Sequence, residues 1–353
     1  MNRFCILLSL IALLSYSSCK DRSREHSAEN IIAGGQMPSL AKDDNGNLHL
    51  VFGNGDSIMY TYSSDKGKSF ADPSLVAVLP KLFSSAMRGP QIACTENGAT
   101  IIAANKSGDI YSYLKDAPGN WQKNAKVNDA DTVAKEGLIA LSGDGKNLFL
   151  VWLDLRGNNH NKIVGAKSTD AGKTWSKNIL IYASPDSTVC ECCKPSVAEK
   201  GDNVYVMFRN WVNGNRDLYL IQSHDGGNKF EAAEKLGNGS WTLNGCPMDG
   251  GGIVINANNK PQTIWRRENK IFSSEPGKPE IEIGEGKNCA IESVNGKTIY
   301  AWTENGEVVC ILPGGKKKKL GKGSLPIIKA LNNEHIICIW ENEKQIHKTV
   351  LEL

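Results

Sequence analysis

Four of the chain's ten cysteines fall into two short segments, Cys190-Glu191-Cys192-Cys193 and Cys246-Pro247-Met248-Asp249. Thiols gathered in this way form disulfides or bind soft metal ions. A bridge between the adjacent Cys192 and Cys193 would strain the peptide between them, so a disulfide is expected to pair Cys246 with Cys190, Cys192 or Cys193. A metal site would hold copper or zinc on three or four thiolates, with Met248 as a further ligand. Both interpretations stay open, because Cys-x-Cys-Cys is not a standard zinc-binding spacing.

Carboxylates and arginines are the second group of residues that could do chemistry. Two carboxyl groups can serve as acid and base on a glycosidic bond, and arginine binds a ligand carboxylate through paired hydrogen bonds. The carboxylates are Glu136, Asp154, Asp249 and Glu268, and the arginines are Arg88, Arg156, Arg209, Arg216, Arg266 and Arg267. Together they suit an anionic or polyhydroxylated ligand. Salt bridges between neighbouring elements are the structural alternative.

A repeated turn indicates which elements position these residues. The segments 63–70, 168–175 and 223–230 share the pattern Ser-x-Asp-x-Gly, and each ends in an aromatic residue. Each follows a short alternating apolar run that is typical of a strand. The Asp can accept hydrogen bonds from the turn's own N–H groups, and the Gly supplies a positive φ. We therefore expect each turn to cap a β-hairpin, with the aromatic side chain packed between neighbouring sheets.

The repeat has the length of one four-stranded blade. Two weaker copies of the turn lie at 115–121 and 273–277. The acidic residue of the turn then recurs at intervals of 50 to 55 residues, at Asp65, Asp116, Asp170, Asp225 and Glu275. Strand starts followed by Gly- or Asn-containing turns give seven such units. The seventh unit lacks an outer strand, which residues 30–33 could supply. The sequence therefore predicts an all-β propeller of seven blades, with six as the alternative.

The turn resembles the Asp-box, or bacterial neuraminidase repeat, of sialidase-like β-propellers, and the resemblance covers nearly all of residues 31–353. In a propeller blade such boxes join the third strand to the fourth, so we expect them to lie on one face and to serve the fold. Residues that precede inner strands, or follow second strands, then meet at the opposite mouth of the central channel. The carboxylates, arginines and clustered cysteines listed above all hold such positions.

Arg88-Gly89-Pro90 resembles the Arg-Ile-Pro motif of sialidases. The resemblance implies that Arg88, Arg209 and either Arg266 or Arg267 grip the carboxylate of an acidic sugar. It also implies an Asp acid, either Asp154 or Asp249, and a Glu that activates a Tyr nucleophile, either Glu136 or Glu268. No tyrosine stands at a predicted mouth position, so the sequence identifies no nucleophile.

The chain looks still more like a subgroup of exported bacterial sialidase-like proteins that carry Cys-x-Cys-Cys and Cys-Pro-Met-Asp-Gly-Gly motifs. Here these motifs occupy 190–193 and 246–251, and the companion stretches are 151–156, 208–211, 216–217 and 265–268. Such proteins are usually described as exo-sialidases by similarity.

The N-terminal residues have the features of a targeting signal. Arg3 precedes an apolar stretch at 4–14 that is too short for a membrane-spanning helix, and Ser17-Ser18-Cys19 resembles a lipoprotein cleavage site. We expect lipidation at Cys19, a flexible tether over 20–30 and a propeller over 31–353. The expected location is a bacterial cell envelope, periplasmic or at the cell surface, with the membrane contacted through the lipid alone.

Net charge is close to neutral at +3, and the densest basic run, 316–319, has no aromatic interleaving. We therefore expect no nucleic-acid partner. We expect a monomer that binds or hydrolyses an acidic glycan or another small anionic ligand. The alternatives are a non-catalytic propeller whose cysteines bind copper or zinc or brace a ligand site, and a protein-interaction scaffold.

Overall fold

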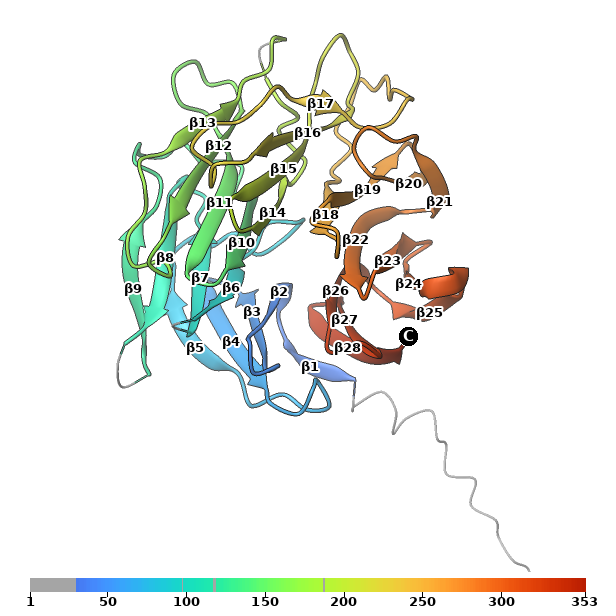
Figure 1. Cartoon of the computed structure of the whole chain (residues 1–353). Helices are drawn as coiled ribbons and strands as arrows, with labels where there is room; N and C mark the ends of the chain where they lie inside the picture. The colour runs from blue at the N-terminus through green and yellow to red at the C-terminus, as the bar shows by residue number, and fades with distance from the viewer. Residues whose placement is uncertain (1–29, 97, 117–118, 187) are drawn as a thin grey trace, which may run out of the picture.

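The protein is an all-β propeller of seven blades, seen in a computed structural model that describes residues 30–353 apart from 97, 117–118 and 187. The described chain runs around the ring blade by blade, and its first and last strands lie in one sheet (Figure 1). Within the described residues no helix is long and apolar enough to cross a membrane. The expected targeting segment, Cys19 and the tether at 20–29 lie outside these residues.

Each blade is a four-stranded antiparallel sheet. The first three comprise β2 (Gln36–Lys42), β3 (Leu48–Asn54), β4 (Ser57–Ser63) and β5 (Ser74–Val78); β6 (Gln91–Thr95), β7 (Gly98–Ala104), β8 (Ile110–Lys115) and β9 (Trp121–Lys126); and β10 (Ile139–Asp144), β11 (Asn147–Asp154), β12 (Lys162–Ser168) and β13 (Ile179–Tyr182). The next three comprise β14 (Ser196–Lys200), β15 (Asn203–Arg209), β16 (Leu218–Ser223) and β17 (Glu234–Lys235); β18 (Gly251–Ile255), β19 (Pro261–Arg267), β20 (Lys270–Ser274) and β21 (Ile281–Glu285); and β22 (Lys287–Val294), β23 (Lys297–Glu304), β24 (Glu307–Ile311) and β25 (Lys317–Lys322), with a 3-10 turn at Pro313–Gly315 before β25.

The seventh blade joins the two ends of the chain. It contains β26 (Ser324–Ala330), β27 (His335–Asn342) and β28 (Gln345–Glu352), and β1 (Ile31–Gly34) pairs with β28 as its outer strand. The N-terminal segment therefore supplies the strand that the C-terminal repeat lacks, as its sequence predicted. This pairing covers an edge of the last sheet and closes the ring.

The inner strands β2, β6, β10, β14, β18, β22 and β26 contact one another in a closed circle around the central channel. Apolar side chains of adjacent sheets pack between the blades. At the closure, for example, Leu50 and Phe52 of β3 pack in one cluster with Ile337 and Ile339 of β27. Because each sheet is buried on both faces, its middle strands are apolar over most of their length; all but one residue of β11 is buried.

The repeated turns join the third strand of a blade to the fourth, as expected. In the turn after β12, the Asp170 carboxylate accepts a hydrogen bond from the Thr174 N–H at 2.9 Å, and the Gly172 N–H donates to the Ser168 hydroxyl at 2.9 Å. Gly172 has a φ of +83°, which favours glycine. The turns after β4 and β16 repeat these contacts around Asp65 and Asp225. The turns therefore stabilise the hairpins. They lie at the rim of the propeller opposite the ends of the second strands.

Candidate functional site

The predicted mouth residues lie where second strands end and inner strands begin. Asp154, Arg209 and Arg267 are the last residues of β11, β15 and β19. Cys193 and Asp249 stand just before β14 and β18. The Arg209 guanidinium donates to the Arg266 carbonyl oxygen at 2.9 Å, which joins the ends of β15 and β19 directly. The structure thus brings a central group of these residues together between the fourth and fifth blades.

A sulfur cluster forms the centre of this group. Cys192 and Cys246 form a disulfide, and the sulfurs of Cys190 and Cys193 are free thiols 3.4 Å apart. The Cys192 sulfur lies 3.6 Å from that of Cys190 and 3.9 Å from that of Cys193. Cys190, Cys192 and Cys193 are all buried. Met248 is 46 % exposed, so its side chain does not share their enclosure.

Close backbone packing holds the two cysteine segments against each other. The Cys190 N–H donates to the Arg209 carbonyl oxygen at 3.1 Å, which fixes the first segment on the end of β15. A Cβ placed on Gly250 would lie only 2.5 Å from the Lys194 carbonyl oxygen. Glycine at 250 therefore permits the approach that places Cys246 beside Cys192.

Two arginines surround the cluster with positive charge. Nη1 of Arg216 lies 3.1 Å from the Cys190 sulfur, and its guanidinium lies over the Trp211 ring at 4.4 Å. Arg209 is almost fully buried and uses two nitrogens on backbone carbonyls, those of Arg216 and Arg266. Its Nε has no hydrogen-bond partner within the described part of the chain. These arginines are therefore committed to the site's own framework and to sulfur.

The thiols respond to these neighbours in opposite directions. The hydrogen bond with Cys193 and the charges of Arg216 and Arg209 lower the pKa of Cys190 despite its burial. Burial, together with the hydrogen bond to Cys190, raises the pKa of Cys193. Of the two thiols, Cys190 is therefore the one that loses its proton more readily.

Asp249 is a buried carboxyl group beside the cluster. Its Oδ2 accepts the Asn288 N–H at 3.1 Å and lies 3.6 Å from Nη1 of Arg266, while its Oδ1 has no partner among the described residues. Burial raises the pKa of Asp249, although Arg209 and Arg266 oppose this effect. Of the two aspartates expected as an acid, Asp249 is the one that keeps an oxygen free.

Asp154 is occupied by structural contacts. It is fully buried and accepts hydrogen bonds from the Trp152 indole at 2.8 Å and from Nε and Nη2 of Arg156, each at 2.9 Å. Arg156 also bonds to Asp129 and Asn178. This network ties β11 to the loops on either side of it, which corresponds to the salt-bridge alternative.

The other predicted residues pair outside the sulfur cluster. Arg88 donates to the Glu136 carbonyl oxygen at 2.6 Å and lies 3.5 Å from its carboxylate. Arg267 forms two hydrogen bonds with Glu280, at 2.8 and 2.6 Å. Glu268 has a φ of +59°, and its carbonyl oxygen accepts from Nε of Arg266. Within the described residues no tyrosine hydroxyl bonds to Glu136 or Glu268, so the structure assembles no Tyr–Glu pair.

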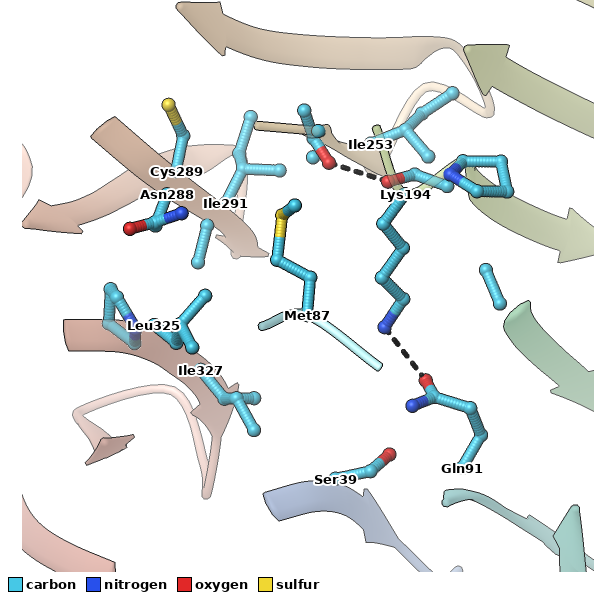
Figure 2. A pocket seen from close by; sticks show the side chains of 18 of the residues that line it. Ser39, Met87, Gln91, Lys194, Ile253, Asn288, Cys289, Ile291, Leu325 and Ile327 are labelled. Atoms are coloured by element: carbon cyan, nitrogen blue, oxygen red, sulfur yellow. Dashed lines mark hydrogen bonds between the residues drawn. The ribbon is translucent and has the colours of Figure 1, made fainter. Parts of the chain in front are cut away.

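A cavity in the central channel contains a residue that the sequence analysis missed. The cavity has a volume of about 330 Å³ and is lined by residues from all seven inner strands. Figure 2 shows the Lys194 side chain extending across it to Gln91, whose Oε1 lies 3.0 Å from Nζ. Burial lowers the pKa of Lys194 to about 8, although the side chain remains partly accessible from the cavity. The sequence feature that could have identified Lys194 is its position between Cys193 and the start of an inner strand, where the other mouth residues lie.

Comparisons with known proteins support the fold. No protein-family model matches the chain, and no curated protein matches its sequence. An ulvan lyase of polysaccharide lyase family PL25 matches with a TM-score of 0.56 at 10 % identity, over 92 % of this chain and 94 % of the other. An α-L-arabinofuranosidase from Fusarium graminearum matches with a TM-score of 0.52 at 14 % identity, over 90 % and 93 %.

An intramolecular trans-sialidase from Ruminococcus gnavus matches with a TM-score of 0.48 at 13 % identity, over 92 % of this chain and 96 % of the other, a likeness too weak to carry an argument. At these identities the similarity establishes a shared propeller fold and nothing finer.

Proposed function

We propose that this propeller binds an acidic saccharide in its central channel and that the Lys194 amine recognises the acid. The observation that carries the proposal is a cation without a counterion. Among the described residues Nζ of Lys194 donates a hydrogen bond to the neutral Gln91 amide at 3.0 Å and forms no ion pair with a carboxylate. A charged amine enclosed in this way is stabilised by an anionic ligand group.

The saccharide part of the proposal is supported by the fold and by the cavity. The ulvan lyase has also been solved bound to GlcA(1-4)Rha3S, an acidic saccharide, at a TM-score of 0.55 to this chain. The cavity here, at about 330 Å³, falls at the small end of ligand sites, and Ser39, Gln91 and Asn288 offer polar groups in its wall. We propose recognition rather than hydrolysis of the sialidase type, because the Tyr–Glu pair is missing from the described residues.

Isothermal titration with 3′-sialyllactose, a glucuronate oligosaccharide and neutral lactose tests this proposal. We expect the acidic saccharides to bind and lactose not to bind. Lys194→Gln should weaken binding roughly tenfold or more, because it removes the enclosed charge. Lys173→Gln, in an exposed turn on the box face, makes the same charge change and should leave affinity unaltered.

Absence of binding by all the acidic saccharides, or equal binding of lactose, would overturn the proposal. Release of free sugar during incubation would overturn its non-hydrolytic part.

We also propose that the chain is exported and anchored in a bacterial envelope through a lipid on Cys19. The support is the sequence pattern at residues 3–19. Labelled palmitate should be incorporated by the full chain in a bacterial host and not by Cys19→Ser; equal labelling of the two would contradict the proposal.

A further inference from the structure

The sulfur cluster has the donor set and spacing of a metal site, independently of any saccharide. Three sulfurs, those of Cys190, Cys192 and Cys193, lie 3.4 to 3.9 Å apart, and the fourth, that of Cys246, is bonded to Cys192. Metal–sulfur bonds of about 2.3 Å separate two sulfurs on one ion by about 3.8 Å in a tetrahedral site and about 4.0 Å in a trigonal one. The separations among the sulfurs of Cys190, Cys192 and Cys193 therefore need to change by only a few tenths of an ångström. The Cys246 sulfur has to move away from that of Cys192 once the disulfide is reduced.

The surroundings carry the charge that bound thiolates require. The buried guanidinium of Arg209 and the Arg216 guanidinium, 3.1 Å from the Cys190 sulfur, supply two positive charges. Three thiolates with a monovalent ion, or four with a divalent ion, have a net charge of −2. The arginines would balance that charge beside the buried sulfurs of Cys190, Cys192 and Cys193, where an uncompensated ion is costly, while Cys246 lies on the exposed side of the cluster. Among the described residues, the side chains close enough together to share one ion are Cys190, Cys192 and Cys193, with no carboxylate among them.

We propose that Cys190, Cys192, Cys193 and Cys246 form a site for a soft metal ion, Cu(I) or Zn(II), in the reduced protein. The Cys192–Cys246 disulfide is then the oxidised, metal-free form. A dithiol reductant gives two electrons and two protons to the disulfide, which becomes two thiols, and the reductant becomes a disulfide. The incoming metal displaces the thiol protons to solvent. Thiolate donors favour these two ions over harder ones such as Mg²⁺ or Ca²⁺.

Anaerobic titrations of the whole soluble chain test this site. The oxidised and the phosphine-reduced protein are each titrated with Cu(I) against bicinchoninate, and with Zn(II) against a chromogenic chelator. We expect the reduced protein to bind one equivalent of one of these ions and the oxidised protein to bind none. The ion that the protein takes stoichiometrically from its chelator is the ion that the site binds.

Variants separate the site from the fold. Cys190→Ala and Cys193→Ala should each weaken metal binding by at least a hundredfold. Cys289→Ala is the matched control, because Cys289 lines the neighbouring channel as a free thiol and is not part of the cluster. X-ray absorption of the loaded wild-type protein, which does not depend on any variant folding, should show a sulfur-only shell at about 2.3 Å.

The proposal is overturned if the reduced protein binds neither ion, if Cys289→Ala weakens binding as much as Cys190→Ala, or if oxygen and nitrogen dominate the metal's shell. Metal binding that is the same before and after reduction would exclude the disulfide as the metal-free form. Because saccharide titration of the oxidised protein does not involve these thiols as ligands, failure of one proposal leaves the other standing.

Discussion

Single residues at the mouth divide into two kinds. Some have their charged groups paired and hold the blades together, and others keep a polar or charged group without a matching partner among the described residues. Asp154 has hydrogen bonds to an indole and a guanidinium, and Arg267 is fully paired with Glu280. Within the part of the chain that the structure describes, Lys194 has a neutral partner and no charged one, and Asp249 keeps one oxygen unpaired. The number of partners, rather than residue type, therefore distinguishes framework from candidate ligand contact at this rim.

The structural role of Asp154 can be measured. We expect Asp154→Asn to lower the free energy of unfolding in urea by about 2 to 3 kcal/mol, because it leaves the Arg156 guanidinium and Trp152 without their charged acceptor. Asp129→Asn removes the more exposed carboxylate on the same arginine and should cost less than about 1 kcal/mol. Unchanged stability of Asp154→Asn would contradict the framework role and return Asp154 to the candidates for chemistry.

At the scale of elements, the repeated turns join neighbouring blades as well as capping hairpins. Phe230, which ends the turn after β16, packs edge-on against Phe149 of β11 in the adjacent blade. The Asp225 carboxylate meanwhile organises the turn backbone. One short segment therefore links hairpin geometry to packing between blades.

Two adjacent glycines in that turn allow these roles to be separated. Gly226 and Gly227 have φ values of +68° and +77°; a Cβ on Gly226 would meet open space, whereas one on Gly227 would lie 2.1 Å from the Phe149 ring. Both alanine variants incur the cost of a left-handed backbone. We expect Gly227→Ala to lose a further 1 to 3 kcal/mol, roughly, from overpacking. Equal losses in urea unfolding would show that the turn does not brace the neighbouring blade.

At the scale of the molecule, closure of the ring turns scattered strand ends into one site. The pairing of β1 with β28, extended by the Lys348 N–H on the Asn30 carbonyl oxygen at 2.8 Å, completes the seventh sheet. The closed ring surrounds one channel, so that Gln91 of the second blade can reach Lys194 before the fourth. Such a contact depends on the curvature of the whole ring and on no single blade.

The sequence by itself determined the strand repeat, the box turns and the ring closure. These depend on local backbone preferences, on positive-φ glycines such as Gly172, and on a period that any one blade displays. It also indicated that Cys246 lies near Cys190, Cys192 and Cys193, since both segments precede neighbouring inner strands.

Only the tertiary structure decided which partner each polar group takes. It joined Cys192 to Cys246, placed Arg216 on the Cys190 sulfur, engaged Arg156 with Asp154, and left Lys194 facing a cavity. The Cys192–Cys246 bridge and the Lys194–Gln91 contact depend on distances between side chains from different blades. Such distances follow from ring curvature and close packing, which no local pattern in the chain specifies.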